Sequence, residues 1–539
     1  MMADGYTRST GKMAMAIAQN GPGITGLVTP IKTAYWNHTP MLLVTPQAAN
    51  KTMGQGGFQE IEQMNLFADM VCYQEEVRAA HRIPEVLNRV IEKAIRGSAP
   101  AQINVPRDFW TQVIDVELPQ IVRLERPSGG AAAISEAAKL LSGAKFPVIL
   151  SGAGVVIGGA IPDCIALAER LDSPVCSGYQ HNDSFPGSHP LAAGPLGYNG
   201  SKAAMELIAK ADVVLALGTR LNPFSTLPGY GIDYWPKDAA IIQVDINSDR
   251  IGLTKDVTVA ICGDAKLVAQ QILDQLSADA GNAGREDRKA TIHQAKSAWL
   301  QTLSSLDHEE DDEGTTWNAD CVTREPEHMT PRQAWRAIQG GLPKDAIISS
   351  DIGNNCAIGN AYPTFEKGRK YLAPGLFGPC GYGFPSIIGA KIGCPDTPVI
   401  GFAGDGAFGI SMNEMTSIGR DDWPAITMVI FRNYQWGAEK RNTILWYHDN
   451  FVGTELNPNL SYAKVADGCG LKGVTVRTQA ELTSALKAGV EAQMNGETTF
   501  IEVILNQELG EPFRRDAMTT PVAVAGISAD DMRPQKSAV

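Results

Sequence analysis

Short apolar runs recur along the chain and are bounded by glycine, proline and polar residues. Runs of this kind are typical of strands that are buried on both faces of a parallel sheet. From residue 399 onward the pattern predicts a strand, a tight turn, a helix, a second strand and a second turn. The strands expected on this basis are 40–45, 146–150, 211–217, 240–245, 399–403 and 425–431.

Three blocks of this pattern divide the chain. We expect a first domain at 1–119, a central domain at 128–276, and a third domain with a C-terminal tail at 331–539. Residues 277–330 are expected to form a polar linker, and its acidic run at 308–313 a solvated face. The length of 539 residues suits three domains of roughly 100–200 residues each. The predicted fold class is therefore α/β, with three doubly wound parallel-sheet domains.

Composition excludes several classes of protein. No apolar run is long enough for a transmembrane helix, and the first residues have neither the basic nor the apolar part of a signal peptide. The 9 cysteines are scattered without a C-x-x-C pair, which favours reduced thiols in a cytoplasmic protein. The net charge of −13 argues against nucleic acid as a partner. An anionic substrate must therefore be attracted by local cations.

The most informative motif is Gly404-Asp405-Gly406, followed 28 residues later (433 − 405) by Asn433. Each part of the motif comes directly after an expected buried strand, and open parallel sheets bind ligands at the carboxyl ends of their strands. An Asp and an Asn offer hard oxygen ligands to Mg²⁺, which leaves its other positions to phosphate and water. The two glycines allow the backbone to approach a phosphate closely. The pattern predicts a site for Mg²⁺ and a diphosphate.

This motif resembles the thiamine diphosphate motif of the pyruvate oxidase and acetolactate synthase superfamily, and the resemblance spans essentially the whole chain. Residues 21–26 look like the superfamily's GPGxTN turn, with Gly26 in place of Asn. Residues 58–60 match its FQE segment, where Gln59 is expected near the cofactor, the alternative being a loop-packing amide. The resemblance also implies that the first domain is incomplete in this chain.

Two further segments of the third domain fit the same superfamily. Residues 351–355 lie where relatives have a D-x-G-Q-H segment that grips the diphosphate, and both asparagines there are able to donate to phosphate oxygens. Residues 378–385 lie where relatives carry GTMGxGxP, so Cys380 takes the place of the Met that bends thiamine. The resemblance implies Mg²⁺ ligation by Asp405, Asn433 and the Gln435 carbonyl. It implies cofactor contacts from Pro22, Asn354, Asn355, Gly378, Cys380, Gly404, Asp405, Gly406, Ala407, Asn433, Gln435 and Trp436.

Within the superfamily the chain is similar to the sulfoacetaldehyde acetyltransferase family. The stretches that carry this likeness are 378–385, 433–442, 450–455 and 509–515. The resemblance implies conversion of sulfoacetaldehyde and phosphate into acetyl phosphate and sulfite, during degradation of taurine-type sulfonates. Cleavage of the C–S bond raises the carbonyl carbon to the acyl level, so no oxidant or flavin is required. Other thiamine diphosphate lyases and acetolactate synthase-like carboligases remain alternatives.

One departure concerns the Glu that activates thiamine in the superfamily. The resemblance places it just ahead of the segment at 2–6, so we expect it upstream of Met1, together with the opening strand and helix of the first domain. A noncatalytic fragment or assembly partner is therefore an alternative of a different class.

Three further expectations follow from the resemblance and the charge. The superfamily's cofactor lies between the first domain of one subunit and the third domain of another, which implies a homodimer or homotetramer. Lys440 and Arg441 follow the predicted metal turn, and we expect Arg441 to bind the substrate anions, the alternative being a solvated helix face for both. Gly152, Gly154 and Gly158 do not complete a dinucleotide fingerprint, so we expect a structural turn in a central domain that binds FAD in some relatives and nothing in others.

Overall fold

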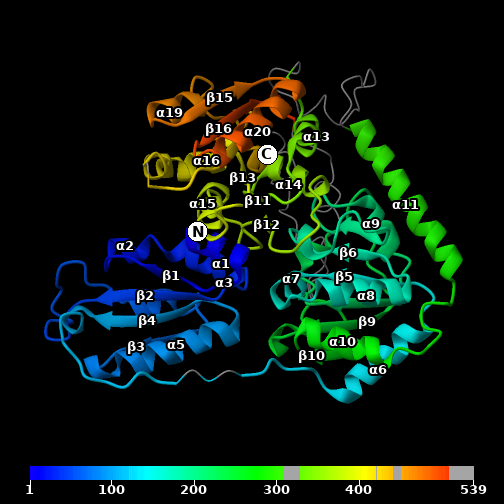
Figure 1. Cartoon of the computed structure of the whole chain (residues 1–539), viewed down its shortest axis with the longest axis horizontal. Coiled ribbons are helices and arrows are strands. Elements are labelled where there is room, and N and C mark those ends of the chain that lie inside the picture. Colours follow the sequence, from blue (N-terminus) through cyan, green and yellow to red (C-terminus); the bar gives the residue numbers. More distant parts are fainter. Residues whose placement is uncertain (121, 123, 307–327, 421, 441–450, 509–539) are drawn as a thin grey trace, which may run out of the picture.

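The computed structural model describes residues 1–120, 122, 124–306, 328–420, 422–440 and 451–508. Three separate parallel sheets form three α/β domains (Figure 1), as the sequence predicts. All six expected strands are present, and no boundary is shifted by more than two residues. In the described part of the chain, every helix is too short or too polar to cross a bilayer.

The first domain has four strands in the order β1-β2-β4-β3. Its central strands are buried, because Met41 to Val44 and Ala101 to Val105 pack against helices on the two faces. The elements are α1 (Met2–Thr10), β1 (Ala14–Ile17), α2 (Pro22–Thr25), α3 (Val28–Trp36), β2 (Met41–Gln47), α4 (Gln63–Phe67), β3 (Tyr73–Glu76), α5 (Ile83–Gly97) and β4 (Ala101–Pro106).

The central domain has six strands in the order β10-β9-β8-β5-β6-β7. The expected linker contains a long helix, α11, whose Ile292, Ala295, Trp299 and Leu303 are buried in the central core. The acidic run at 308–313 lies outside the described residues. The elements are α6 (Ala131–Gly143), β5 (Pro147–Ser151), α7 (Ala153–Gly158), α8 (Ile161–Leu171), β6 (Val175–Ser177), β7 (Ala192–Pro195), α9 (Lys202–Ile208), β8 (Val213–Leu217), β9 (Ala240–Asp245), β10 (Val259–Cys262), α10 (Ala265–Gln275) and α11 (Arg285–Leu306).

The third domain has six strands in the order β12-β11-β13-β14-β16-β15. Gly404 pairs with Phe431 in the register of β13 and β14, so Asp405 and Arg432 follow side by side at the sheet's edge. The elements are α13 (Pro331–Gly341), β11 (Ile347–Ser350), α14 (Asn354–Ile358), β12 (Tyr371–Leu372), α15 (Gly383–Gly393), β13 (Val399–Gly404), α16 (Asp405–Ser411), α17 (Met415–Ile418), β14 (Thr427–Arg432), α19 (Tyr462–Gly468), β15 (Lys472–Val476), α20 (Gln479–Met494) and β16 (Thr499–Ile504).

Helix α1 of the first domain packs closely against α15 of the third (Figure 1). A Cβ on Gly5 would lie 2.0 Å from the Ser386 carbonyl oxygen, and one on Gly389 would lie 1.8 Å from the Met2 carbonyl oxygen. The Tyr382 hydroxyl, at the start of α15, donates to Asp4 Oδ2 at 2.6 Å. The backbones of the two helices therefore touch, and this contact holds the first domain against the third.

We predict that Gly5→Ala and Gly389→Ala each destabilise the protein by roughly 1–3 kcal/mol, because the added methyl group overlaps backbone atoms that cannot move freely. The measurement is the midpoint of thermal unfolding by calorimetry. Gly340→Ala is the matched control, since Gly340 lies in α13 and its Cβ would meet no atom within 4 Å. Equal midpoints for all three variants would contradict the proposed close contact.

Candidate active site

A cavity opens at the carboxyl edge of the third sheet, between the ends of three adjacent strands, β11, β13 and β14. This is the place where open α/β sheets bind ligands. The residues predicted from the third domain come together here. The predicted residues in its wall are Asn354, Asn355, Gly378, Cys380, Gly404, Asp405, Gly406, Ala407, Asn433, Gln435 and Trp436.

Asp405 begins helix α16 and is buried, and its two carboxylate oxygens have different surroundings. Oδ2 accepts from Arg432 Nη1 at 2.8 Å and from the Tyr434 N–H at 2.7 Å, while Oδ1 accepts from the Gly406 N–H at 3.0 Å. Burial raises the pKa of Asp405 to about 6, and the guanidinium of Arg432 opposes that rise. The carboxylate is held in one orientation at the floor of the cavity.

Tyr434 reaches Asp405 because its backbone adopts a left-handed conformation, with φ of 61°. The chain then turns back, and Trp436 N–H donates to the Thr454 carbonyl while Leu456 N–H donates to the Tyr434 carbonyl. Neither of these bonds uses the carbonyl of Gln435, which lies between them. The turn thus presents Asn433 and Gln435 at the cavity.

Several buried amide atoms in the wall have no hydrogen-bond partner among the described residues. They are Asn354 Nδ2 and Oδ1, Asn355 Oδ1, Asn433 Nδ2 and Gln435 Oε1. Buried polar groups are normally paired, so unpaired groups that converge on a cavity indicate a polar ligand. A Cβ on Gly353 or Gly404 would meet no atom within 4 Å, so the backbone at both positions faces open space. These features fit the phosphate oxygens and the cation of a metal-bound diphosphate.

The two glycines of the Asp405 motif have different surroundings. A Cβ on Gly406 would lie 2.8 Å from Cε3 of Trp436, so the indole ring requires a glycine at this position. Of these two glycines, Gly404 is the one beside which a Cβ would meet open space.

Asp351 is a residue that the sequence analysis did not single out as functional. Its Oδ1 accepts from the N–H groups of Ile352 and Gly381, and its Oδ2 accepts from the Gly383 N–H at 2.7 Å. Burial raises its pKa to about 7. Asp351 therefore ties the end of β11 to the segment that carries Cys380, whose own thiol pKa is raised to about 11, mainly by burial.

Pro22 and Gln59 do not line this cavity. They lie together in the first domain, where Gln59 Oε1 accepts from Gln19 Nε2 at 2.7 Å and a Cβ on Gly21 would meet the Gln59 backbone. Pro22 is exposed and Gln59 half-buried. Arg441 lies outside the described residues.

The position of Lys440 differs from the solvated helix face that the sequence analysis gives as an alternative for it. It is buried, and its Nζ donates to Glu455 Oε1 at 2.7 Å. It is therefore neither on a solvated helix face nor in the wall of the cavity. Glu439, which the sequence analysis did not select, lines the cavity instead.

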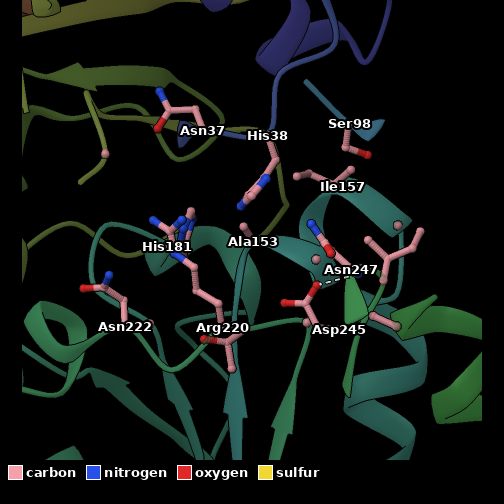
Figure 2. A pocket seen from close by; sticks show the side chains of 18 of the residues that line it. Asn37, His38, Ser98, Ala153, Ile157, His181, Arg220, Asn222, Asp245 and Asn247 are labelled. Carbon is pink, nitrogen blue, oxygen red and sulfur yellow. Dashed lines mark hydrogen bonds between the residues drawn. The ribbon is translucent and has the colours of Figure 1, made fainter. Parts of the chain in front are cut away.

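A second cavity lies at the carboxyl edge of the central sheet and reaches the first domain (Figure 2). Asp245 ends β9 and Asn247 follows it, Arg220 follows β8, and His38 enters from the first domain. A Cβ on Gly154 would lie 2.7 Å from Gly218 Cα, so this glycine is required by the close approach of two turns. None of the predicted site residues lines this cavity.

Electrostatics distinguish this second cavity from the first. The Arg220 guanidinium lies over the Trp36 ring, 4.5 Å from its centroid, and burial lowers its pKa to about 10. Burial, and then the charges of Arg250 and Arg220, lower the pKa of His38 well below its usual value, so this imidazole is neutral. The wall of the central cavity contains Arg8, Arg126 and Arg220 beside the carboxylates of Asp245 and Asp264, whereas the third-domain cavity is built from amides and carboxylates.

Comparison with known families assigns all three domains. The chain matches the models "Thiamine pyrophosphate enzyme, N-terminal TPP binding domain" at residues 1–66, "central domain" at 134–272 and "C-terminal TPP binding domain" at 351–503. The third match includes β13, β14 and every residue given above for the wall of the third-domain cavity. The expected thiamine diphosphate superfamily is thereby confirmed.

Similar proteins extend over almost the whole chain. A probable sulfoacetaldehyde acetyltransferase of Rhizobium meliloti is 79% identical over 99% of this chain and 91% of its own length. A sulfoacetaldehyde acetyltransferase of Roseovarius nubinhibens is 74% identical over 99% of this chain and 89% of its own length. A probable acetolactate synthase large subunit of Methanococcus aeolicus is 31% identical over 90% of this chain and 81% of its own length. The chain therefore belongs to the sulfoacetaldehyde acetyltransferase family of thiamine pyrophosphate enzymes.

Proposed function

We propose that this protein converts sulfoacetaldehyde and phosphate into acetyl phosphate and sulfite, with thiamine diphosphate as its cofactor. The observation that carries the proposal is the identity of 79% over 99% of the chain to a probable sulfoacetaldehyde acetyltransferase. The lower identity of 31% to a probable acetolactate synthase subunit makes carboligation the weaker candidate.

The third-domain cavity supplies the groups that such a cofactor requires. Asp405, Asn433 and the backbone carbonyl of Gln435 would hold Mg²⁺, and the amides of Asn354 and Asn355 would donate to the diphosphate. The described residues contain no group of three or more His, Cys, Asp and Glu side chains suited to a metal. A site of one carboxylate with amide and carbonyl oxygens is consistent with Mg²⁺, which takes its remaining ligands from phosphate and water.

Thiamine diphosphate, when bound, supplies a nucleophilic carbon that lets an aldehyde carbon react as an acyl donor. The protein's part is to orient this carbon and exclude water. Cys380 and Trp436 form apolar parts of the wall, and Asp351 fixes the segment of Cys380 through the backbone N–H groups of Gly381 and Gly383. The reaction is redox-neutral overall. The aldehyde carbon is oxidised to the acyl level, and the neighbouring carbon, which loses sulfite, is reduced to a methyl group.

The first domain completes the site in a second copy of the chain, according to this proposal. Pro22 and Gln59 lie together in the first domain, and neither lines the third-domain cavity of the same chain. A cofactor held between two copies would use both domains, in a homodimer or homotetramer. Anion binding by Arg441 and a cytoplasmic location stay predictions.

We predict that the protein forms acetyl phosphate and sulfite in equal amounts from sulfoacetaldehyde and phosphate when thiamine diphosphate and Mg²⁺ are present. Both products are measured, with acetolactate formation from pyruvate as the competing assay. Acetolactate without acetyl phosphate would contradict the proposal and favour a carboligase.

We predict that Asp405→Ala weakens Mg²⁺-dependent binding of thiamine diphosphate by about 100-fold or more, since even outer-shell changes cost 10–100-fold at metal sites. Calorimetry with both components gives the affinity. Asp422→Ala is the matched control, because Asp422 lies in the same domain on the surface and pairs only with Arg420 in the contacts described. An unchanged affinity for Asp405→Ala would exclude this metal site.

We predict a dimer or tetramer at micromolar concentration, because the site needs a first domain from a second copy. Sedimentation equilibrium gives the mass relative to the 57.7 kDa chain. Gln59→Ala is expected to weaken cofactor binding although Gln59 does not line the cavity of its own chain. A monomer that binds cofactor with unchanged affinity in the Gln59→Ala variant would refute the shared site.

A further inference from the structure

Arg432 is an unusual residue for its position. It ends β14, directly before Asn433, and is fully buried in a strand that is otherwise apolar or neutral. A buried guanidinium loses its hydration and is retained only where fixed partners replace the water. The contacts of Arg432 therefore indicate what the cation does.

The partners of Arg432 hold it in one position. Nη1 donates to Asp405 Oδ2 at 2.8 Å, and Nη2 donates to the carbonyls of Asn457 and Leu460. The guanidinium carbon lies 4.4 Å from the ring centroid of Tyr434 and 5.5 Å from that of Tyr462. A planar group that is hydrogen-bonded on its edge and covered by two rings cannot swing away from Asp405.

A second buried carboxylate, that of Glu502, also lies near the guanidinium of Arg432. Glu502 Oε1 lies 3.7 Å from Arg432 Nε, and the Glu502 carboxylate accepts from Ser461 Oγ at 2.6 Å and from the Tyr462 N–H at 3.0 Å. Asp405, Arg432 and Glu502 thus form a chain with formal charges of −1, +1 and −1, which sum to −1. A cation at the cavity would meet one net negative charge.

We propose that Arg432 is the positioning residue for the metal site, because it occupies Asp405 Oδ2 and so leaves Oδ1 to bind Mg²⁺. Oδ2 already accepts from two donors, whereas the one donor to Oδ1 among the described residues is the adjacent Gly406 N–H. The positive charge of Arg432 repels Mg²⁺, so Arg432 favours metal binding only through its orientation of the Asp405 carboxylate. The inference rests on the proposed Mg²⁺ and thiamine diphosphate site.

The charge of Arg432 and its role in orienting Asp405 predict opposite changes in metal affinity when Arg432 is replaced, so the direction of the change distinguishes them. Arg432→Met changes the net charge of the three residues from −1 to −2, so charge alone predicts tighter metal binding and loss of orientation predicts weaker binding. Arg432→Met/Glu502→Gln restores the net charge to −1 without the guanidinium. We expect this double variant to bind metal about 10–100-fold more weakly than the unmodified protein. Arg432→Lys, which keeps the charge but loses the planar fork, is expected to bind with intermediate affinity.

The experiment titrates Mn²⁺ into the protein with thiamine diphosphate present and follows the EPR signal of free Mn²⁺, a readout that does not need activity. Arg288→Met is the matched control, because Arg288 is also buried but bonds only backbone carbonyls of the central domain in the contacts described. It is expected to lower the midpoint of thermal unfolding and leave Mn²⁺ affinity unchanged.

The outcomes separate this inference from the proposed function. If the unmodified protein binds no Mn²⁺ with thiamine diphosphate, the proposed site itself is wrong. If it binds and the double variant binds equally well, Arg432 does not position Asp405. If Arg432→Met fails to fold, the charge-matched double variant and Arg432→Lys still decide the question. Mn²⁺ affinities in both variants equal to that of the unmodified protein would overturn the inference.

Discussion

The pairing of the Asp405 carboxylate with its fixed donors is the interaction on which the candidate site depends. A carboxylate buried without partners would take up a proton rather than carry charge, and burial does raise the pKa of Asp405 to about 6. Two backbone N–H groups and the Arg432 guanidinium keep the charged form accessible. The register of β13 and β14 places these groups together, because Gly404 lies opposite Phe431 and the next residues of both strands reach the sheet edge side by side. The parallel sheet thereby fixes the chemistry at its edge.

The contact of α1 with α15 connects the cavity wall of the third domain to the first domain. The Tyr382 hydroxyl bonds Asp4 at one end of the Cys380 segment, while Asp351 bonds the Gly381 and Gly383 N–H groups within it. The wall of the cavity is thus clamped from both domains of the same chain. Gln59, by contrast, bonds only Gln19 and Asn20 of its own domain in the contacts described, and it is absent from the wall of the third-domain cavity.

Much of this arrangement follows from the sequence, and the exceptions have physical reasons. The strands and the Asp405–Asn433 pair were predictable, since apolar runs and the edge of a parallel sheet fix both. Helix α11 was missed within the expected linker, although its buried residues, from Ile292 to Leu303, recur at spacings of three and four. Arg432 was passed over because a charged residue normally marks the end of a buried strand, whereas here it is the partner of Asp405. The contact of Lys440 with Glu455 joins residues 15 positions apart in the sequence, and no local pattern encodes it.

Charge sets a last constraint on the cavity. Its described wall contains the carboxylates of Asp405 and Glu439 and no Lys, Arg or His side chain. Amide dipoles alone are not enough to bind a diphosphate in this cavity, because its negative charges would be repelled strongly by the two carboxylates at close range in a low-dielectric site. A divalent cation is therefore needed before the cofactor binds tightly. The anionic substrates face the same field, together with a net charge of −13 over the chain. Their counter-charges must come from a divalent cation in the cavity or from groups other than those of the described wall.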